Sequence, residues 1–237
     1  ISVIIVVYND ALRLEQTLLS IFNQTYKNIE LCIIDGGSTD GTIDIIKQYQ
    51  NKIAFWKSEP DTGIYDAMNK GIKAVKGDWV YFIGAGDILL NLLNKITPLF
   101  KNDNCIYYGN VYRNDIGAIF DGNYPSYKLA VQNICHQGIF YPVKALRKYN
   151  FNTKYISYAD YDLNIRCYGD DNLVFEYMPV LVCIYEGDGY SDLHRLTDPF
   201  LGDKPAIIKA NFSYPIYIYT KLRTMIAKLV KPGYLKQ

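Results

Sequence analysis

Hydrophobic positions in the first hundred residues follow two periods in turn. Continuous runs of β-branched and aliphatic residues predict buried strands at Ser2–Val7, Ile29–Ile34, Ile53–Lys57 and Trp79–Ile83. Between these runs, apolar residues recur at helical spacing, first at Leu14, Leu18, Ile21 and Phe22, then over Thr42–Tyr49, then at Ile64, Met68, Ile72 and Val75. This alternation predicts an α/β fold with a mostly parallel sheet, helices on both faces, and ligands bound at the carboxyl ends of the strands.

The pattern changes in the second part of the chain. The elements expected there are a helix at Ile88–Phe100, a strand at Cys105–Tyr112, its hairpin partner at Ile116–Phe120, a helix at Tyr158–Tyr168, and strands at Leu173–Tyr177 and Leu181–Tyr185. No internal repeat or linker divides the chain. We therefore expect one domain over residues 1–203, with a first half (1–100) and a second half (101–203), followed by a separate segment over residues 204–237.

Composition and charge exclude several classes of protein. The 237 residues are 49% hydrophobic and 21% charged, which is typical of a folded globular protein. The net charge of +1 gives no general attraction to nucleic acid, so DNA binding as a main role is not expected. The five cysteines show no metal-binding or C-x-x-C spacing and are expected to be reduced. No apolar stretch reaches ~18 residues, so we expect a cytoplasmic protein that is neither secreted nor integral to the membrane.

The segment 204–237 differs in charge from the rest of the chain. It contains seven Lys and Arg residues and no Asp or Glu, whereas residues 1–203 have 18 basic and 24 acidic residues. After Pro215, helical spacing joins Ile218, Leu222, Met225, Ile226, Leu229 and Val230. Such a basic amphipathic helix is typical of segments that bind anionic membrane surfaces. The alternative is a C-terminal helix that packs on the protein's own core.

Polar residues follow the second predicted strand, in the loop Asp35–Thr42. The loop is not a G-x-G-x-x-G motif, because its glycines are too close together and it follows the second strand, so dinucleotide binding is not favoured. Asp40 has an ordinary interpretation as the N-cap of the next helix. Capping does not explain Asp35 at the strand end, which is therefore a candidate binding residue.

Three segments carry a resemblance to a known family. They are Ser2–Asn9, Ile33–Thr42 and Ser58–Gly71, the last containing Glu-Pro-Asp-x-Gly-Ile-Tyr-Asp-Ala-Met-Asn-Lys-Gly. Together they resemble family 2 glycosyltransferases of the GT-A fold, and among these the bacterial transferases of colanic-acid and other surface-polysaccharide pathways. The resemblance extends, with gaps, to about Ser191. It implies a nucleotide-sugar donor, with Tyr8, Asn9, Asp35 and Asp61 around the nucleotide and the Asp35 carboxylate accepting the uracil imino N–H.

The resemblance also indicates a metal site after the fourth strand. Many family members have two carboxylates there that hold a divalent cation, but this chain has Ile83-Gly84-Ala85-Gly86-Asp87 and retains only Asp87. A cation that bridges two phosphates needs few protein ligands, so Mg²⁺ or Mn²⁺ at Asp87 remains the expectation. The alternative interpretation of Asp87 is the cap of a helix at Ile88–Phe100.

The resemblance implies that residues 1–100 are the nucleotide-binding half and residues 101–203 the acceptor half, and that the acceptor half contains the catalytic base. The segment Ala159–Arg166 resembles the acidic motif of the family, and Asp160 matches the carboxylate that takes the proton of the acceptor hydroxyl. Asp162 is a rival two residues away, which places it about 200° around a helix. The resemblance further implies that His136, Gln137, Gly189 and Ser191 border the donor or acceptor, whereas His194 is expected to be an ordinary surface histidine.

These expectations combine into one function and one alternative. The chain is expected to be an inverting glycosyltransferase that moves a sugar from a UDP-linked donor to a hydroxyl of a lipid-linked glycan, in bacterial surface-polysaccharide synthesis at the inner face of the cell membrane. The alternative is a nucleotide-sugar-binding protein without turnover, suggested by the reduced metal motif. A retained catalytic base would have no purpose in such a protein.

Overall fold

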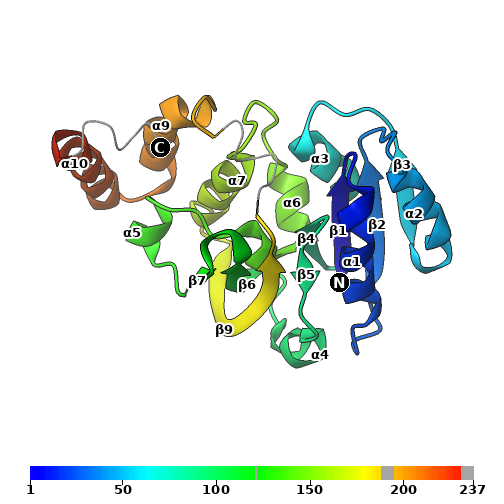
Figure 1. Cartoon of the computed structure of the whole chain (residues 1–237). Helices are drawn as coiled ribbons and strands as arrows, with labels where there is room; N and C mark the ends of the chain where they lie inside the picture. The colour runs from blue at the N-terminus through cyan, green and yellow to red at the C-terminus, as the bar shows by residue number, and fades with distance from the viewer. Residues whose placement is uncertain (121, 188–194, 231–237) are drawn as a thin grey trace.

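The computed structural model describes residues 1–120, 122–187 and 195–230, and residue 228 only in its backbone. Within these residues, one nine-stranded sheet has the order β3-β2-β1-β4-β8-β6-β9-β5, with β7 paired to β6 (Figure 1). The strands are β1 (Ser2–Val7), β2 (Glu30–Asp35), β3 (Phe55–Ser58), β4 (Trp79–Gly84), β5 (Ile88–Leu89), β6 (Cys105–Arg113), β7 (Ala118–Phe120), β8 (Ile139–Pro142) and β9 (Val174–Tyr185).

Helices surround this sheet. The α-helices are α1 (Ala11–Phe22), α2 (Thr42–Gln48), α3 (Ile64–Ala74), α4 (Leu93–Ile96), α5 (Ser126–Leu129), α6 (Val143–Tyr149), α7 (Ala159–Tyr168), α9 (Phe200–Asn211) and α10 (Tyr214–Val230). Short 3₁₀ segments are η1 (Gln50–Lys52), η2 (Thr97–Leu99), η3 (Asn114–Ile116) and η4 (His136–Gly138).

The first half has the predicted parallel arrangement. Strand β1 pairs in parallel with β2 and β4, and β2 pairs in parallel with β3. Alternate residues of β1 serve two cores: Ile4 packs with α3, while Val3 and Ile5 pack with α1. Helix α3 lies very close to the sheet, since a Cβ added at Gly71 would be 2.8 Å from the Ile4 side chain. The α/β fold predicted from the sequence is confirmed, and the carboxyl ends of β1, β2 and β4 meet at one edge.

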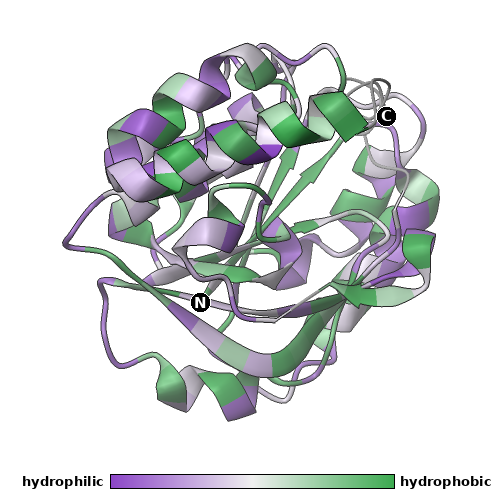
Figure 2. Cartoon of the chain, turned by 90° about the vertical axis from the view of Figure 1, so that its left-hand side faces the viewer, coloured by the Kyte–Doolittle hydropathy of each residue, from purple (hydrophilic) through white to green (hydrophobic). Residues whose placement is uncertain are grey.

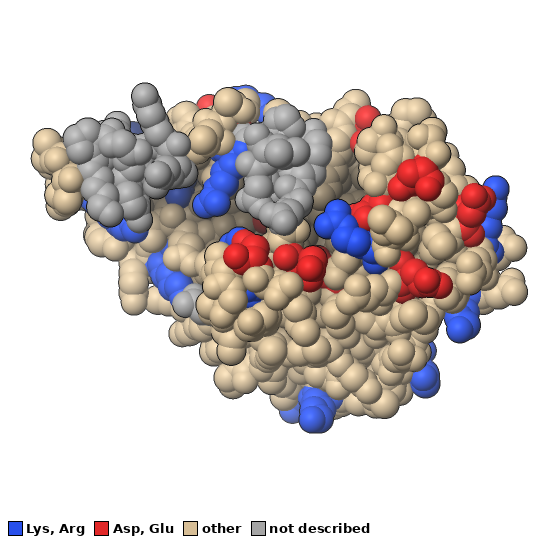
Figure 3. Space-filling view, in the orientation of Figure 1, with Lys and Arg blue, Asp and Glu red and all other residues tan. Residues whose placement is uncertain are grey.

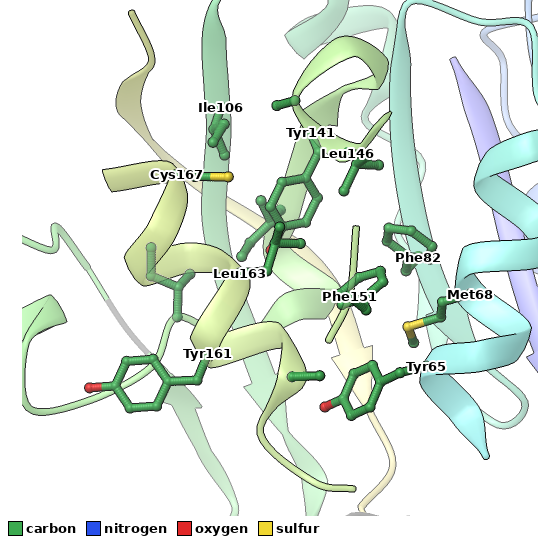
Figure 4. Close-up of a cluster of buried hydrophobic side chains, with 14 of the residues drawn as sticks. Tyr65, Met68, Phe82, Ile106, Tyr141, Leu146, Phe151, Tyr161, Leu163 and Cys167 are labelled. Carbon is green, nitrogen blue, oxygen red and sulfur yellow. The ribbon is translucent and has the colours of Figure 1, made fainter. Parts of the chain in front are cut away.

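The second half continues the same sheet with mixed strand directions. Strand β8 is antiparallel to β4 and β6, and β9 is parallel to β6. Figure 4 shows Tyr161, Leu163 and Cys167 of α7 on one side of a buried cluster and Tyr65 and Met68 of α3 on the other. Because both halves contribute to this cluster, the N-terminal turn of α7 has a fixed place relative to α3.

Two local predictions were wrong. Ile88–Phe100 is not one helix, because Ile88 and Leu89 form β5 and pair antiparallel with β9, leaving only the short α4 and η2 after it. The two strands expected at residues 173–177 and 181–185 are not separate: from Val174 on they belong to the single strand β9, which shifts its register against β6.

The C-terminal segment forms helices α9 and α10. The predicted boundary at residue 203 lies inside α9, whose Phe200 is buried against Tyr155, Tyr158 and Tyr161. The predicted helix after Pro215 is confirmed as part of α10, which packs on α9 and α5. Its apolar residues Leu222, Met225, Ile226, Leu229 and Val230 are 50–75% exposed, and its last turn is green in Figure 2. Within the described ranges, no helix has the length and apolar content needed to cross a membrane.

Candidate active site

Asp35 is buried beneath the loop after β2 and binds this loop through hydrogen bonds. It has no exposed surface. Its carboxylate accepts hydrogen bonds from the backbone N–H groups of Gly37 and Ser38 at 2.9 Å, from the Ser58 hydroxyl at 2.6 Å, and from the Ser38 hydroxyl. A buried carboxylate with four donors holds a loop in one conformation. The direct contact between Asp35 and uracil therefore stays a prediction that this arrangement does not favour.

Tyr8 and Asp61 lie together at the surface of the same loop. The Tyr8 ring is 65% exposed, and Asn9 follows it with a positive φ of 49°. A Cβ added at Gly36 would be 2.7 Å from Asp61 Oδ2 and 3.2 Å from Tyr8 Cδ2. Asp61 Oδ1 accepts the backbone N–H of Gly63 at 2.8 Å. The ring and the carboxylate thus share the space over Gly36, which is suited to a flat ligand with an N–H group.

Asn9 is part of the scaffold of this edge. Its side-chain oxygen accepts the backbone N–H of Thr39 at 2.8 Å, and its own backbone N–H donates to the Ser38 hydroxyl at 2.7 Å. Asp40, predicted to cap α2, accepts the backbone N–H of Thr42 and also that of Ala11, the first residue of α1. The loop after β2 therefore fixes the starts of both helices.

Asp87 lies at the end of β4 and is 3% exposed. Its carboxylate accepts hydrogen bonds from the Gln137 amide and the backbone N–H of Gly84 at 3.2 Å, and from the backbone N–H of Glu186 at 3.1 Å. Burial raises the pKa of the Asp87 carboxyl, although these hydrogen bonds oppose the rise. Asp87 therefore joins the strand end to the His136-Gln137 segment and to the chain after β9.

The carboxylate of Asp87 is the chief oxygen ligand that this part of the structure offers a cation. Among the described residues, no group of three or more His, Cys, Asp or Glu side chains could hold a metal ion. A single carboxylate fits Mg²⁺ or Mn²⁺ only when ligand phosphates and water supply most of the coordination. The donor set is compatible with a cation that arrives with a diphosphate.

Asp160 begins α7 and is 8% exposed, at the floor of a cleft of about 580 Å³. Its Oδ1 accepts hydrogen bonds from the Tyr65 hydroxyl at 3.0 Å and from the backbone N–H of Tyr161 at 2.8 Å. Its Oδ2 accepts the Asn133 amide at 2.8 Å and lies 3.7 Å from His136 Nδ1. Burial and the charge of Asp160 raise the pKa of Tyr65 strongly, so this hydroxyl stays a neutral donor.

Asp162 faces away from this cleft. Its carboxylate pairs with Arg166 one turn further along α7, at 2.8 Å from Nε, and is 4% exposed. Burial raises the pKa of the Asp162 carboxyl, and the Arg166 guanidinium opposes the rise. His136 and Gln137, by contrast, line the same cleft as Asp160. The two carboxylates of α7 therefore have separate surroundings, as their spacing predicts.

The structure adds residues that the sequence did not single out. Tyr65 and Asn133 hold Asp160, and four basic side chains line the cleft, namely Arg113, Arg195, Lys204 and Arg223. Tyr65 lies within the motif Ser58–Gly71, so the sequence marks the position of Tyr65. It does not show that Tyr65 binds Asp160. Gly189, Ser191 and His194 lie outside the described residues.

The site has an exposed Tyr8 ring and the Asp61 carboxylate at the strand ends, a buried carboxylate after β4 and a second carboxylate that lines a cleft, as is typical of α/β proteins that bind ligands at the carboxyl ends of their strands. The chain belongs to glycosyl transferase family 2, because the model of that family matches residues 2–160. The fold is the GT-A fold.

Named relatives agree with this assignment. The PGL/p-HBAD biosynthesis glycosyltransferase of Mycobacterium bovis (strain BCG / Pasteur 1173P2) is 34% identical over 197 residues, which cover 79% of this chain and 77% of the relative. An uncharacterized glycosyltransferase of Haemophilus influenzae is 35% identical over 115 residues, which cover 46% of each chain.

Solved structures share the fold at low sequence identity. S. aureus TarS 1–349 has a TM-score of 0.65 and 16% identity, with 88% of this chain and 78% of that chain covered. Glucosyl-3-phosphoglycerate synthase from Mycobacterium tuberculosis, crystallised with Mn²⁺, UDP and glucosyl-3-phosphoglycerate, has a TM-score of 0.61 and 16% identity, with 89% and 79% covered. Neighbours of this fold thus bind a nucleotide together with a divalent cation.

Proposed function

We propose that the protein is an inverting glycosyltransferase that moves a sugar from a UDP-linked donor to a hydroxyl of a lipid-linked glycan at the inner face of a bacterial membrane. The observation that supports this proposal most directly is Asp160, a carboxylate held by Tyr65 and Asn133 at the floor of the cleft. A carboxylate fixed by two donors and reachable from a cleft is suited to act as a general base.

The proposed reaction needs one proton transfer and one displacement. Asp160 takes the proton of the acceptor hydroxyl while its oxygen forms a bond to the anomeric carbon of the donor sugar. The bond from that carbon to the diphosphate breaks, its electrons leave with UDP, and the configuration at the carbon inverts. Since His136 Nδ1 lies 3.7 Å from Asp160 Oδ2, the imidazole is placed to orient the acceptor hydroxyl or the carboxylate.

Recognition of the nucleobase of the donor is assigned to Tyr8 and Asp61. The exposed Tyr8 ring offers a stacking face, and Asp61 Oδ2 lies over Gly36 without a hydrogen bond from any described residue. An acceptor in this place suits the imino N–H of uracil, which cytosine lacks. Asp35 and Asn9 position this surface through the hydrogen bonds beneath it.

The proposed cofactor is Mg²⁺ or Mn²⁺, with Asp87 as its carboxylate ligand. When bound, the cation neutralises the charge that develops on the leaving diphosphate. Gln137 holds one oxygen of Asp87, so it fixes the direction in which this carboxylate points.

Membrane association is assigned to α10. Its exposed apolar residues recur at positions 222, 225, 226 and 229, which form one stripe along the helix, and Lys221 and Arg223 are exposed beside them. Left of centre in Figure 3, over α5, α9 and α10, Lys and Arg side chains gather and Asp and Glu are nearly absent. This combination matches an anionic membrane surface, where a lipid-linked acceptor would be located.

The test replaces the proposed base with its isostere. In Asp160→Asn, transfer from UDP-sugars to a panel of prenyl-diphosphate-linked glycans should fall by roughly 10²–10⁴, while UDP binding by calorimetry should persist. Asp162→Asn serves as the matched control on the same helix and should retain transfer as long as the variant is folded. Transfer near wild type in Asp160→Asn would exclude it as the base.

The same experiment decides the alternative. A nucleotide-sugar-binding protein without turnover would bind UDP in every variant and show no transfer in the wild type with any donor and acceptor pair. The position of Asp160, away from the Tyr8 and Asp61 surface and inside the acceptor cleft, speaks against a binding role for it.

A further inference from the structure

The cleft above Asp160 has an uneven distribution of charge. Its lining includes Arg113, Arg195, Lys204 and Arg223, and Asp160 is the one carboxylate that the described lining residues contribute. Arg113 is neutralised by Asp115. The other three cations form no ion pair with any carboxylate in the part of the chain that the structure describes. They lie on the chain before α9, on α9 and on α10, so the positive charge gathers at the end of the cleft formed by the C-terminal helices.

Lys204 shows that this charge is held in place by the fold. Its ammonium donates to the Val131 carbonyl at 3.2 Å and lies 4.5 Å from the centre of the Tyr161 ring. Burial and the nearby charge of Arg223 lower the pKa of Lys204 to about 8. A half-buried lysine next to an arginine costs free energy in the empty protein, and an anion between them would remove that cost.

The position of this charge separates it from the donor. Tyr8, Asp35 and Asp61, at the ends of β1 to β3, do not line this cleft. Asp87 is joined through Gln137 to the wall of the cleft beyond His136. In Figure 1, α9 and α10 lie at the opposite side of the molecule from β2 and β3. A ligand whose hydroxyl reaches Asp160 could therefore extend its remainder toward Lys204 and Arg223.

We propose that Lys204 and Arg223, with Arg195 in the same cleft, bind a phosphate or diphosphate group of the acceptor. This inference rests on the proposed function and names the class of substrate at the same site: an acceptor with a hydroxyl at Asp160 and an anionic phosphate toward the C-terminal helices. Arginine donates a planar pair of N–H groups to phosphate oxygens, and the lysine ammonium adds a point charge. The phosphate comes from a prenyl diphosphate or from a soluble sugar phosphate.

Calorimetry with inorganic pyrophosphate tests this site in the full-length protein. Saturating UDP is added first, so that the donor site is occupied and its integrity is measured in the same sample. Pyrophosphate should still bind to the wild type, and Lys204→Gln/Arg223→Gln should weaken that binding by roughly tenfold or more. UDP affinity should not change in this variant.

A second double variant controls for the general loss of positive charge. Lys209→Gln/Lys47→Gln removes two exposed lysines, one on α9 and one on α2, and should bind pyrophosphate like the wild type. The proposal is overturned if pyrophosphate does not bind the UDP-loaded wild type, if both double variants lose binding equally, or if the Lys204 and Arg223 variant loses UDP affinity instead. If the wild type itself does not bind UDP, the proposed function is refuted rather than this inference.

Two further ligands distinguish the sources of the phosphate. Farnesyl diphosphate in detergent represents a prenyl carrier, and glucose 1-phosphate represents a soluble sugar phosphate. Tighter binding of the first, lost in Lys204→Gln/Arg223→Gln, assigns the site to a lipid-linked acceptor. Tighter binding of the second, lost in the same variant, assigns it to a soluble phosphorylated acceptor.

Discussion

Asp35 and Asp61 lie near the proposed nucleotide-binding surface but have different surroundings. Asp35 is fully buried and accepts four hydrogen bonds from its own loop and from Ser58. Asp61 uses one oxygen for the backbone N–H of Gly63 and keeps the other over Gly36. The number of donors around each carboxylate therefore separates a positioning residue from a residue that can meet the base.

Replacement of Asp61 tests whether this carboxylate binds the nucleobase. Asp61→Asn keeps the shape of the side chain and removes the charged acceptor, so UDP affinity should fall roughly tenfold, since a hydrogen bond to a charged group contributes ~1.5–3 kcal/mol. Calorimetric titration with UDP measures this change. The midpoint of thermal unfolding should hardly move, and UDP affinity equal to that of the wild type would remove Asp61 from the base contact.

Replacement of Asp35 has a different expected result. In Asp35→Asn, an NH₂ group replaces one carboxylate oxygen that accepts N–H or O–H groups in the wild type. Because NH₂ cannot accept these hydrogen bonds, the free energy of unfolding should fall by ~2 kcal/mol or more. Urea unfolding of the two variants side by side measures this difference. A fully stable Asp35→Asn that loses only UDP affinity would instead support the direct contact with uracil predicted from the sequence.

Asp87 allows a test of the cofactor. Transfer should stop in EDTA and return with Mg²⁺ or Mn²⁺, and Asp87→Ala should abolish this rescue because it removes the carboxylate ligand at the end of β4. The control is Asp44→Ala, an exposed carboxylate on α2. Full activity of the wild type in EDTA would show that no divalent cation is needed and that cationic side chains neutralise the diphosphate.

At the residue scale, the sequence indicated Asp87, which lies after β4, and Asp160, which lines the cleft. It did not indicate the residues that donate hydrogen bonds to them. Asp160 and Asp87 lie in local patterns that can be recognised from neighbours in the chain. The hydrogen bonds from Tyr65 and Asn133 to Asp160 join residues 95 and 27 positions apart. Such partners depend on how α3 and the loop before η4 pack, and no local spacing encodes that packing.

At the scale of elements, the sequence predicted the alternating strands and helices of the first half well. Strands β1, β2 and β4 there are buried on both faces of the sheet, so each is a continuous run of apolar residues. The prediction failed at Ile88–Leu89, because these residues are apolar in a helical spacing and become a strand only through long-range pairing with Ile184 and Cys183. The two strands expected at residues 173–177 and 181–185 form the single strand β9, which continues through Pro179, a residue that strands tolerate where the register shifts.

The exposed stripe of α10 leads to a prediction about membranes. Leu222→Ser/Met225→Ser removes two apolar side chains from the stripe and should reduce co-sedimentation with anionic phosphatidylglycerol vesicles several-fold, because each lost apolar contact weakens insertion. Higher salt should weaken binding of the wild type as well, since exposed charges are screened. Pelleting is measured against neutral phosphatidylcholine vesicles.

The matched control is Leu12→Ser/Leu19→Ser on α1, where both leucines are also exposed, at 97% and 43%. This variant should pellet like the wild type. Equal loss in the two double variants, or no pelleting of the wild type, would contradict a specific membrane role for α10. Removal of the chain after Asp203 is unsuitable for this purpose, because it would cut α9 between the buried Phe200 and Ile208.

On the scale of the whole molecule, two halves with different electrostatic surroundings share one sheet. The edge at the ends of β1 to β3 is built from carboxylates and loop N–H groups, whereas the far end of the cleft is built from basic side chains of α9 and α10. The two halves should therefore respond differently to pH.

The pH dependence of anion binding follows from Lys204. Its pKa is lowered to about 8, so the ammonium that binds an anion is present below that pH and is lost as the pH rises through it. The groups that face it are Arg223 of α10, the Tyr161 ring of α7 and the Val131 carbonyl, with Asp160 and Arg195 elsewhere in the cleft. Pyrophosphate affinity of the UDP-loaded protein should fall between pH 7 and 9.

Lys204→Arg supplies the control, because a guanidinium stays charged over this range. It should keep its pyrophosphate affinity at pH 9 relative to pH 7 better than the wild type does, with the same ligand ionisation in both samples. Parallel pH profiles of the two proteins would show that Lys204 does not titrate at the site.

The hydrogen bond from Tyr65 to Asp160 connects the two parts of the proposed site. Tyr65 lies in the first turn of α3, four residues after Asp61, so the proposed nucleobase contact and the side chain that holds the proposed general base share one short stretch of chain. Because α3 and α7 pack in one buried cluster, this stretch holds the carboxylate at a fixed separation from the proposed donor surface, and the site is preorganised for both substrates.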